Sequence, residues 1–169
     1  MAERTSLRDY QRELAQRLRG AERGGTASKL GVQVGDENWL VDLADAGEVI
    51  PVPPITPVPL TRPWFKGVTN IRGSLYSVVD FPGFLGGAAV ALGDQARLLL
   101  IGERFHMNSA LLVNRSLGLR NPERLQLRGH GGIVSSWLKA EYTDAEGGLW
   151  KELDVPQLLQ HPDFLGVGV

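Results

Sequence analysis

Three histidines, His106, His130 and His161, are the side chains of this sequence best suited to metal or acid–base chemistry. Each stands alone, without a second histidine four residues away and without HExxH spacing, so the sequence predicts no metal centre. The glycine-rich residues 129–132 superficially resemble a phosphate-binding loop. They lack the GK[ST] ending and the GxGxxG spacing, and we interpret them as an ordinary loop.

Carboxylates are spread along the chain without a suggestive pair, and no GxSxG nucleophile motif occurs. Asp80 ends an apolar run, as the phospho-accepting aspartate of a receiver domain does. A receiver also needs a helix after its first strand, where a hairpin is predicted instead. We therefore interpret Asp80 as the cap of a turn at residues 81–83. No catalytic residue and no cofactor is predicted; a small β-barrel enzyme that uses scattered carboxylates remains the alternative from a different functional class.

The composition suits one compact domain or two small lobes. The chain has 169 residues, of which 43% are hydrophobic and 22% charged, and its net charge is −1. This near-neutral charge argues against nucleic acid as a partner, and no apolar run approaches the roughly 18 residues of a membrane span. The absence of cysteine and of an apolar secretory leader fits a cytoplasmic address.

The first 27 residues are expected to form a helix and a linker that precede the main domain. Apolar side chains at spacings of three and four predict a helix over residues 6–19, and glycines 20, 24 and 25 mark a flexible linker: the stripe is Leu7, Tyr10, Leu14 and Leu18. A fourteen-residue helix is marginal alone, so its stripe must pack on its own domain or on a partner, and both remain open. Residues 1–29 carry seven Lys or Arg against four acids, which favours an acidic partner or simple solvation.

From residue 28 the pattern changes to short strands. Leu30, Val32 and Val34 alternate with other residues, and further strands are predicted at 39–41, 67–70, 75–79, 98–101, 110–113, 138–142 and 149–153. Residues 36–38 suit a turn, and residues 44–48 suit one helical turn. Six of the ten prolines lie in residues 51–63, which must form a surface connection or a sheet edge. Asp154 is expected to cap a short C-terminal helix with Pro156 in its first turn.

Residues 64–86 read as a strand, a tight turn and a second strand. Gly73 can adopt the positive φ that such a turn requires, and Asn70 can hydrogen-bond nearby backbone. Arg72 then stands at the corner of a rigid hairpin. From the residues alone, it is either a solvated arginine or a recognition group.

The same segment carries a resemblance to a known family. The run KGVTNIRG at residues 66–73, followed by Val78, Val79 and Asp80, resembles the signature of the CheW-like domain family. The resemblance continues upstream of this run. Residues 35–37 and Trp39 lie where the family has its first hairpin, and Glu48 with Val49 matches a Glu-hydrophobic pair that follows it. The resemblance extends over residues 30–165, more strongly in the first half than in the second. The domain is accordingly expected to occupy residues 28–165.

The resemblance implies a mostly β fold of two SH3-like five-stranded β-barrels packed together, and no catalysis. The N-terminal helix and the short C-terminal helix predicted from the residues complete the expected fold. Family members couple a methyl-accepting chemoreceptor, through its cytoplasmic tip, to the regulatory domain of a CheA-type histidine kinase. Glu48, Asn70 and Arg72 match receptor-side positions, and Gly67 matches one where a side chain would be damaging. The protein is then expected to be cytoplasmic, without membrane insertion, and recruited to membrane-associated receptor arrays.

Further details resemble the PilI-type branch of the family, which serves the chemotaxis-like system of type IV pili and twitching motility. These are the N-terminal extension, residues 64–67, residues 84–86 and the QHPDFL ending. The flagellar coupling protein is the alternative within the family. The sequence departs from the family pattern at Asn114, where an aspartate is usual, so no contact residue of the second barrel is transferred. The loop at residues 126–136 is also unlike typical members.

Overall fold

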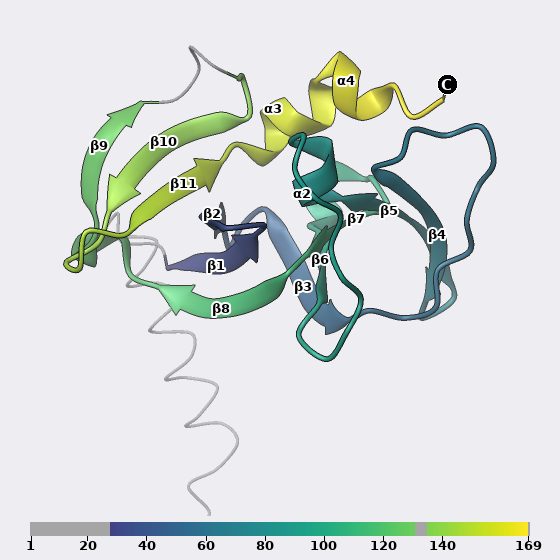
Figure 1. Cartoon of the computed structure of the whole chain (residues 1–169), viewed down its shortest axis with the longest axis horizontal. Helices are drawn as coiled ribbons and strands as arrows, with labels where there is room; N and C mark the ends of the chain where they lie inside the picture. The colour runs from purple at the N-terminus through teal and green to yellow at the C-terminus, as the bar shows by residue number, and fades with distance from the viewer. Residues whose placement is uncertain (1–27, 131–134, 169) are drawn as a thin grey trace, which may run out of the picture.

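The computed structural model describes residues 28–130 and 135–168 (Figure 1). This part of the chain is mostly β, with two sheets and a few short helices. The prediction of a mostly β fold in two lobes is therefore confirmed. The helix predicted at residues 6–19 and the linker that follows it lie outside the described residues.

The larger sheet has six strands in the order β8-β1-β2-β11-β10-β9, one more than the five expected for each lobe. β11 runs parallel to β2, and the other neighbours are antiparallel. The first hairpin of the domain thus joins the last strands of the chain in one sheet. The strands are β1 (Lys29–Val34), β2 (Glu37–Asp42), β8 (Arg115–Arg120), β9 (Gln126–His130), β10 (Leu138–Thr143) and β11 (Leu149–Leu153).

The smaller sheet has five strands in the order β3-β6-β7-β5-β4. They are β3 (Ala46–Pro51), β4 (Phe65–Ile71), β5 (Ser74–Asp80), β6 (Arg97–Ile101) and β7 (Ser109–Val113). The proline-rich segment leaves the edge strand β3 and pairs once with the opposite edge, through Thr56 and Val68. Its placement as an edge and surface connection confirms the expectation from the prolines, which lack the N–H that an inner strand needs.

Short helices lie between and after the strands: α2 (Phe81–Phe84), α3 (Val155–Gln160), α4 (Pro162–Leu165) and the 3-10 turns η1 (Glu103–Phe105) and η2 (Pro122–Arg124). The predicted C-terminal helix is α3, and the Asp154 carboxylate caps it by accepting from the Gln157 N–H. Asp80 caps α2 in the same way, through the Gly83 N–H. None of the helices in the described part is long and apolar enough to cross a membrane.

Three local predictions were wrong or incomplete. Residues 44–48 do not form a helical turn, because the chain turns at 43–45 and then enters β3, whose Val49 pairs with Leu99 of β6. The first hairpin turn is shorter than residues 36–38, since Glu37 already pairs with Val34 in the β1–β2 ladder. Strands β8 and β9 were not predicted; β9 begins the loop that looked unusual, at residues 126–130.

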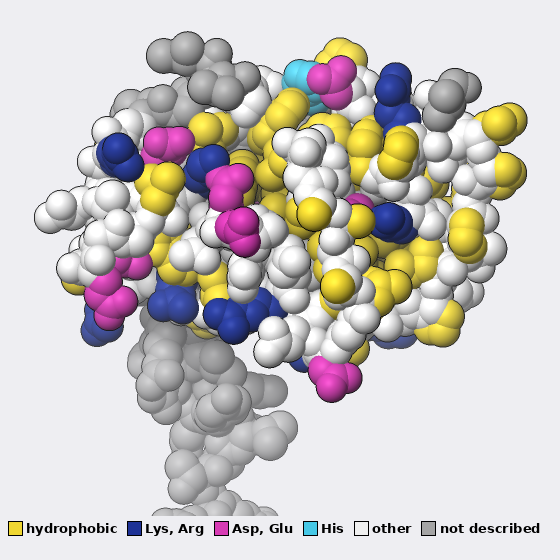
Figure 2. Space-filling view, viewed as in Figure 1, with side chains coloured by type: hydrophobic (Ala, Val, Ile, Leu, Met, Phe, Trp, Pro, Cys, Tyr) yellow, Lys and Arg dark blue, Asp and Glu magenta, His cyan; other side chains and the backbone are white. Residues whose placement is uncertain are grey.

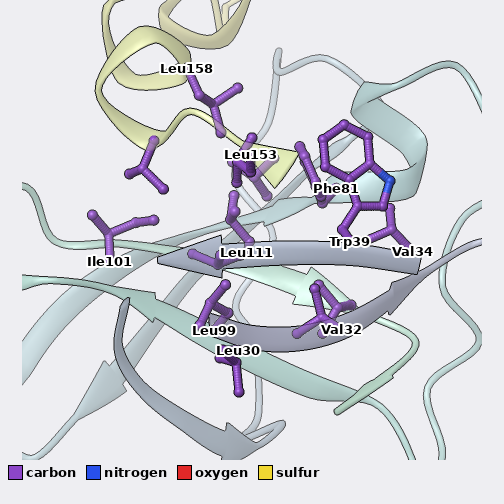
Figure 3. Close-up of a cluster of buried hydrophobic side chains, with 14 of the residues drawn as sticks. Leu30, Val32, Val34, Trp39, Phe81, Leu99, Ile101, Leu111, Leu153 and Leu158 are labelled. Atoms are coloured by element: carbon purple, nitrogen blue, oxygen red, sulfur yellow. The ribbon is translucent and has the colours of Figure 1, made fainter. Parts of the chain in front are cut away.

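The main core lies where the two sheets face each other (Figure 3). Alternate side chains of β1 and β2 meet alternate side chains of β6 and β7, and α3 covers them with Leu158, which is fully buried. The Trp39 ring meets the Phe81 ring edge-on, with centroids 5.4 Å apart. Each sheet therefore depends on the other to bury one of its faces.

The strands β6 and β7 are buried on both faces. Leu99 and Leu111 belong to the core between the sheets, whereas Leu98 and Leu112 belong to a second core on the other face of the five-stranded sheet. This explains the continuous apolar runs in both strands, where a strand with one wet face would alternate. The centre of the smaller sheet is consequently enclosed on both of its faces.

Gly67, in β4, is the position of the described domain where a side chain would clash most severely. Its φ is +128°, and a Cβ added there would lie 2.0 Å from the carbonyl oxygen of Thr56. The close approach allows the Thr56 and Val68 backbones to exchange hydrogen bonds of 2.8 and 2.9 Å. Gly67 thus holds the proline-rich segment against the sheet.

Gly67→Ala is expected to destabilise the domain by about 3 kcal/mol, because it combines a strained backbone with a backbone clash. Gly93→Ala is the matched control, since a Cβ added at Gly93 meets nothing within 4 Å. Its effect on the free energy of unfolding should stay within about 0.5 kcal/mol. Urea unfolding of both variants measures the difference. Equal, small effects would contradict the structural role of Gly67.

A partly buried polar cluster lies in the six-stranded sheet, around the buried Glu152. The Lys29 ammonium forms an ion pair with the carboxylate of Glu152, to which the Tyr142 hydroxyl also donates over 3.3 Å. Burial by itself would lower the pKa of Lys29, but the hydrogen bond and the charge of Glu152 together raise it. Burial and then Glu152 raise the pKa of Tyr142. Both shifts favour the protonated groups in the folded chain.

These shifts predict a loss of stability at alkaline pH. The stabilisation is fully present below the unfolded pKa values, near 10.5 for Lys29 and 10.0 for Tyr142, and is lost as pH rises through the higher folded values. Urea midpoints measured from pH 8 upward should fall more steeply for the wild type than for Glu152→Gln, in which the shared carboxylate is gone. Parallel curves for the two proteins would show that the cluster is not responsible.

Candidate partner-binding site

The hairpin of β4 and β5 ends in a two-residue turn formed by Arg72 and Gly73. Both residues have positive φ, +52° and +85°, as in the turns whose twist suits a two-residue hairpin. The Asn70 side-chain oxygen accepts a hydrogen bond of 2.9 Å from the Gly73 N–H. The predicted roles of Gly73 and Asn70 in the turn are therefore confirmed. The turn and this hydrogen bond also hold the backbone of Arg72 in place.

The Arg72 guanidinium forms a hydrogen-bonded ion pair with the carboxylate of Glu48. The arginine side chain is 69% exposed and the glutamate side chain 49% exposed. Glu48 lies in β3 and Arg72 follows β4, so the pair joins the two opposite edges of the five-stranded sheet. The hydrogen bond and charge of Glu48 raise the pKa of Arg72. Two residues matched separately in the sequence thus form one charged pair at the surface.

A surface pocket of about 300 Å³ lies around this pair; it is called the hollow below. The hollow is lined by residues of β3, β4, β5, β6 and η1: Gly47, Glu48, Ile71, Arg72, Ser74, Tyr76, Leu100, Ile101 and Glu103. The charged groups of Glu48 and Arg72, which pair with each other, lie there beside the apolar side chains of the lining. Among residues 28–130 and 135–168, no three His, Cys, Asp or Glu side chains gather in a way that could hold a metal ion. The polar side chains that line this hollow can form hydrogen bonds and ion pairs.

The structure brings Glu48, Asn70 and Arg72 together and separates Gly67 from them. Gly67 is buried within β4 under the proline-rich segment, so its matched position has a structural basis in backbone packing. Leu75, which is 60% exposed, pairs with Asn70 across the hairpin and was missed. The two-residue turn could have revealed it, because the turn length fixes which residues of β5 stand opposite β4.

Asp80 anchors the other end of the hairpin. It is fully buried, accepts from the N–H groups of Gly83 and Val90, and lies 3.7 Å from the Lys66 ammonium. Asn114, where the sequence departs from the family pattern, is also structural. Its side-chain oxygen accepts a 2.7 Å hydrogen bond from the Gly35 N–H, which ties β1's turn to the end of β7.

On the face shown in Figure 2, hydrophobic side chains gather around α2 and along the proline-rich segment on the right. The half-buried Trp64 ring packs edge-on against the Phe84 ring, with ring centroids 5.1 Å apart. The Phe84 and Trp137 ring centroids are 5.3 Å apart. Phe164 of α4 completes this aromatic cluster. The cluster joins the exit of the hairpin to the C-terminal helices, so the hairpin base is held from both ends of the domain.

Comparison with known proteins agrees with this architecture. The model of the CheW-like domain matches residues 29–163. The chain belongs to the CheW-like domain family. It is 32% identical to Protein PilI of Pseudomonas aeruginosa over 94 residues, which cover 56% of this chain and 52% of that protein. The matched part thus spans about half the length of this curated relative.

A solved structure shows the same fold. It is the scaffolding protein TtCheW from Thermoanaerobacter tengcongensis, which superposes with a TM-score of 0.64 at 15% identity. The match covers 76% of this chain and 89% of that one. At this identity the likeness concerns the fold.

Asn70→Leu is expected to lower the free energy of unfolding by about 1 kcal/mol, because the Gly73 N–H loses its side-chain acceptor. Asn70→Asp keeps an oxygen at the same place and serves as the matched control. Chemical denaturation of both variants provides the measurement. A loss of the same size in both would mean that the side-chain hydrogen bond does not hold the turn.

Proposed function

We propose that this protein is a non-catalytic coupling protein that links a methyl-accepting chemoreceptor to a CheA-type histidine kinase. The observation that carries the proposal is the corner of the β4–β5 hairpin. There a constrained backbone presents the largely exposed Arg72 beside Glu48. Family membership supplies the class of partner, and the hairpin supplies a surface on which the receptor can be recognised.

The chemistry of the corner suits the tip of a helical hairpin. An arginine fork can donate to the free carbonyl oxygens at a helix end and to neighbouring carboxylates at the same time. The turn and the ion pair with Glu48 restrict Arg72 before binding, so less conformational entropy is lost when the partner docks. Exposed Leu75, opposite Asn70, adds apolar area next to the charged pair.

The similarity to Protein PilI supports the more specific part of the proposal, a role in the chemotaxis-like control of type IV pili and twitching motility. The protein then works in the cytoplasm and is recruited to membrane-associated receptor arrays. Pull-down from cell extract separates this role from flagellar coupling. Recovery of a pilus-system receptor and kinase supports it, and recovery of the flagellar pair contradicts it.

Arg72→Ala is expected to weaken binding of a receptor cytoplasmic fragment roughly thirtyfold, the effect of losing an interface arginine worth about 2 kcal/mol. Binding of the kinase regulatory domain should be unchanged, because it uses a different face. Calorimetric titration of both partners against wild type and variant gives the comparison. Arg115→Ala, which removes an exposed arginine from β8 of the other sheet, is the matched control.

The outcomes are distinct. Selective loss of receptor binding supports the assignment of the site. An equal loss of affinity for receptor and kinase, at an unchanged melting temperature, contradicts it. Exchanging the charges, Glu48→Arg with Arg72→Glu, retains an ion pair across the sheet. If receptor binding survives the exchange, the pair only stabilises the fold, and the site assignment is wrong.

A further inference from the structure

A second hollow, of about 400 Å³, lies on the six-stranded sheet, away from the Arg72 corner. Its floor includes Trp150, which is 4% exposed and donates from its indole nitrogen to Asp144 over 3.0 Å. The Arg120 guanidinium carbon lies 5.1 Å from the centre of the Trp150 ring. Leu119 stands on the rim, 64% exposed, with Leu125 half-buried beside it.

The described chain starts at the rim of this hollow. In the pairing of β1 with β8, Lys29 stands opposite Arg120 and Leu30 opposite Leu119. Figure 1 shows the start of β1 beside the end of β8. Residues 1–27 are therefore joined to the domain next to an exposed leucine and a floor that contains tryptophan.

The sequence of residues 1–27 has what such a hollow can accept. The stripe of Leu7, Tyr10, Leu14 and Leu18 lies on one side of the predicted helix, which spans about 21 Å at full length. Residues 20–28 can extend at most about 30 Å and average roughly 16 Å. The linker is therefore long enough for the predicted helix to lie against the hollow.

Apolar burial and tethering favour residues 1–27 as the occupant of the hollow. Charge does not discriminate between possible occupants. The hollow is lined by Asp144 and Glu146 but also by Arg120 and Arg124, and residues 1–27 carry six arginines and four acids. A segment joined by a short flexible linker has an effective concentration of about millimolar, above that of a separate cellular partner. The predicted helix is marginal alone and is stabilised by burying its stripe.

We propose that residues 1–27 dock in cis on this hollow, with the Leu7–Tyr10–Leu14–Leu18 stripe against Leu119 and its neighbours. This answers the question that the sequence leaves open, whether the stripe packs on its own domain or on a partner. It concerns the six-stranded sheet and does not depend on receptor binding at Arg72.

Disulfide trapping tests the proposal in the full chain, which contains no cysteine of its own. The reporter pair is Leu14→Cys with Leu119→Cys. In the first control, Gln16→Cys replaces Leu14→Cys, which moves the thiol to the opposite side of the predicted helix. In the second control, Leu92→Cys, at a leucine 66% exposed beside the five-stranded sheet, replaces Leu119→Cys. Mild oxidation is followed by non-reducing electrophoresis and mass spectrometry, after the reduced variants are shown to melt like the wild type.

Intramolecular closure of the reporter pair should be at least about tenfold faster than closure of either control, at a rate independent of protein concentration. Equal rates for all three pairs would mean that the tether samples the surface without docking, and would overturn the proposal. Failure of the reporter pair to close would also overturn it. A disulfide formed only between chains, faster at higher concentration, would assign the hollow to a second copy instead.

Discussion

The packing of the two sheets against each other is the interaction on which the rest of the structure depends. Both sheets bury a face in one shared core, where Trp39 of the larger sheet meets Phe81 at the end of β5. Strands β6 and β7 also carry leucines on their second face, so the smaller sheet is fixed from both sides. Neither sheet can shift without exposing leucine and valine side chains that contribute about 1.5–3 kcal/mol each when buried.

This rigidity reaches the surface through the β4–β5 hairpin. Val78 and Val79 place β5 in both cores, and Asp80 fixes its end by capping α2. At the other end, the turn at Arg72 and Gly73 extends from the enclosed part of the sheet into solvent. A fixed backbone, one charged pair and a neighbouring leucine suit a protein that recognises partners.

The six-stranded sheet differs from its neighbour in how it is covered. One face contributes to the shared core, while the partly buried Lys29–Glu152 pair and the buried Trp150 lie outside both hydrophobic clusters. Its edges carry exposed leucines, among them Leu119 and Leu127. Apolar edge positions of this kind invite further packing. The two lobes accordingly offer different surfaces, a charged corner on one and a hollow lined by both apolar and charged side chains on the other.

The sequence by itself determined the features that depend on neighbouring residues. Apolar patterns located most strands, and the glycine of the NIRG run identified the tight turn. Asp80 was identified as the cap of a turn and Asp154 as the cap of a helix. These signals act over a few residues. Tertiary structure decided what depends on distant residues. Residues 44–48 became a turn and a strand because β6 offered a ladder. Glu48 meets Arg72 only because the sheet brings its edges together, and β1 and β2 join the C-terminal strands because a shared core between the sheets requires it.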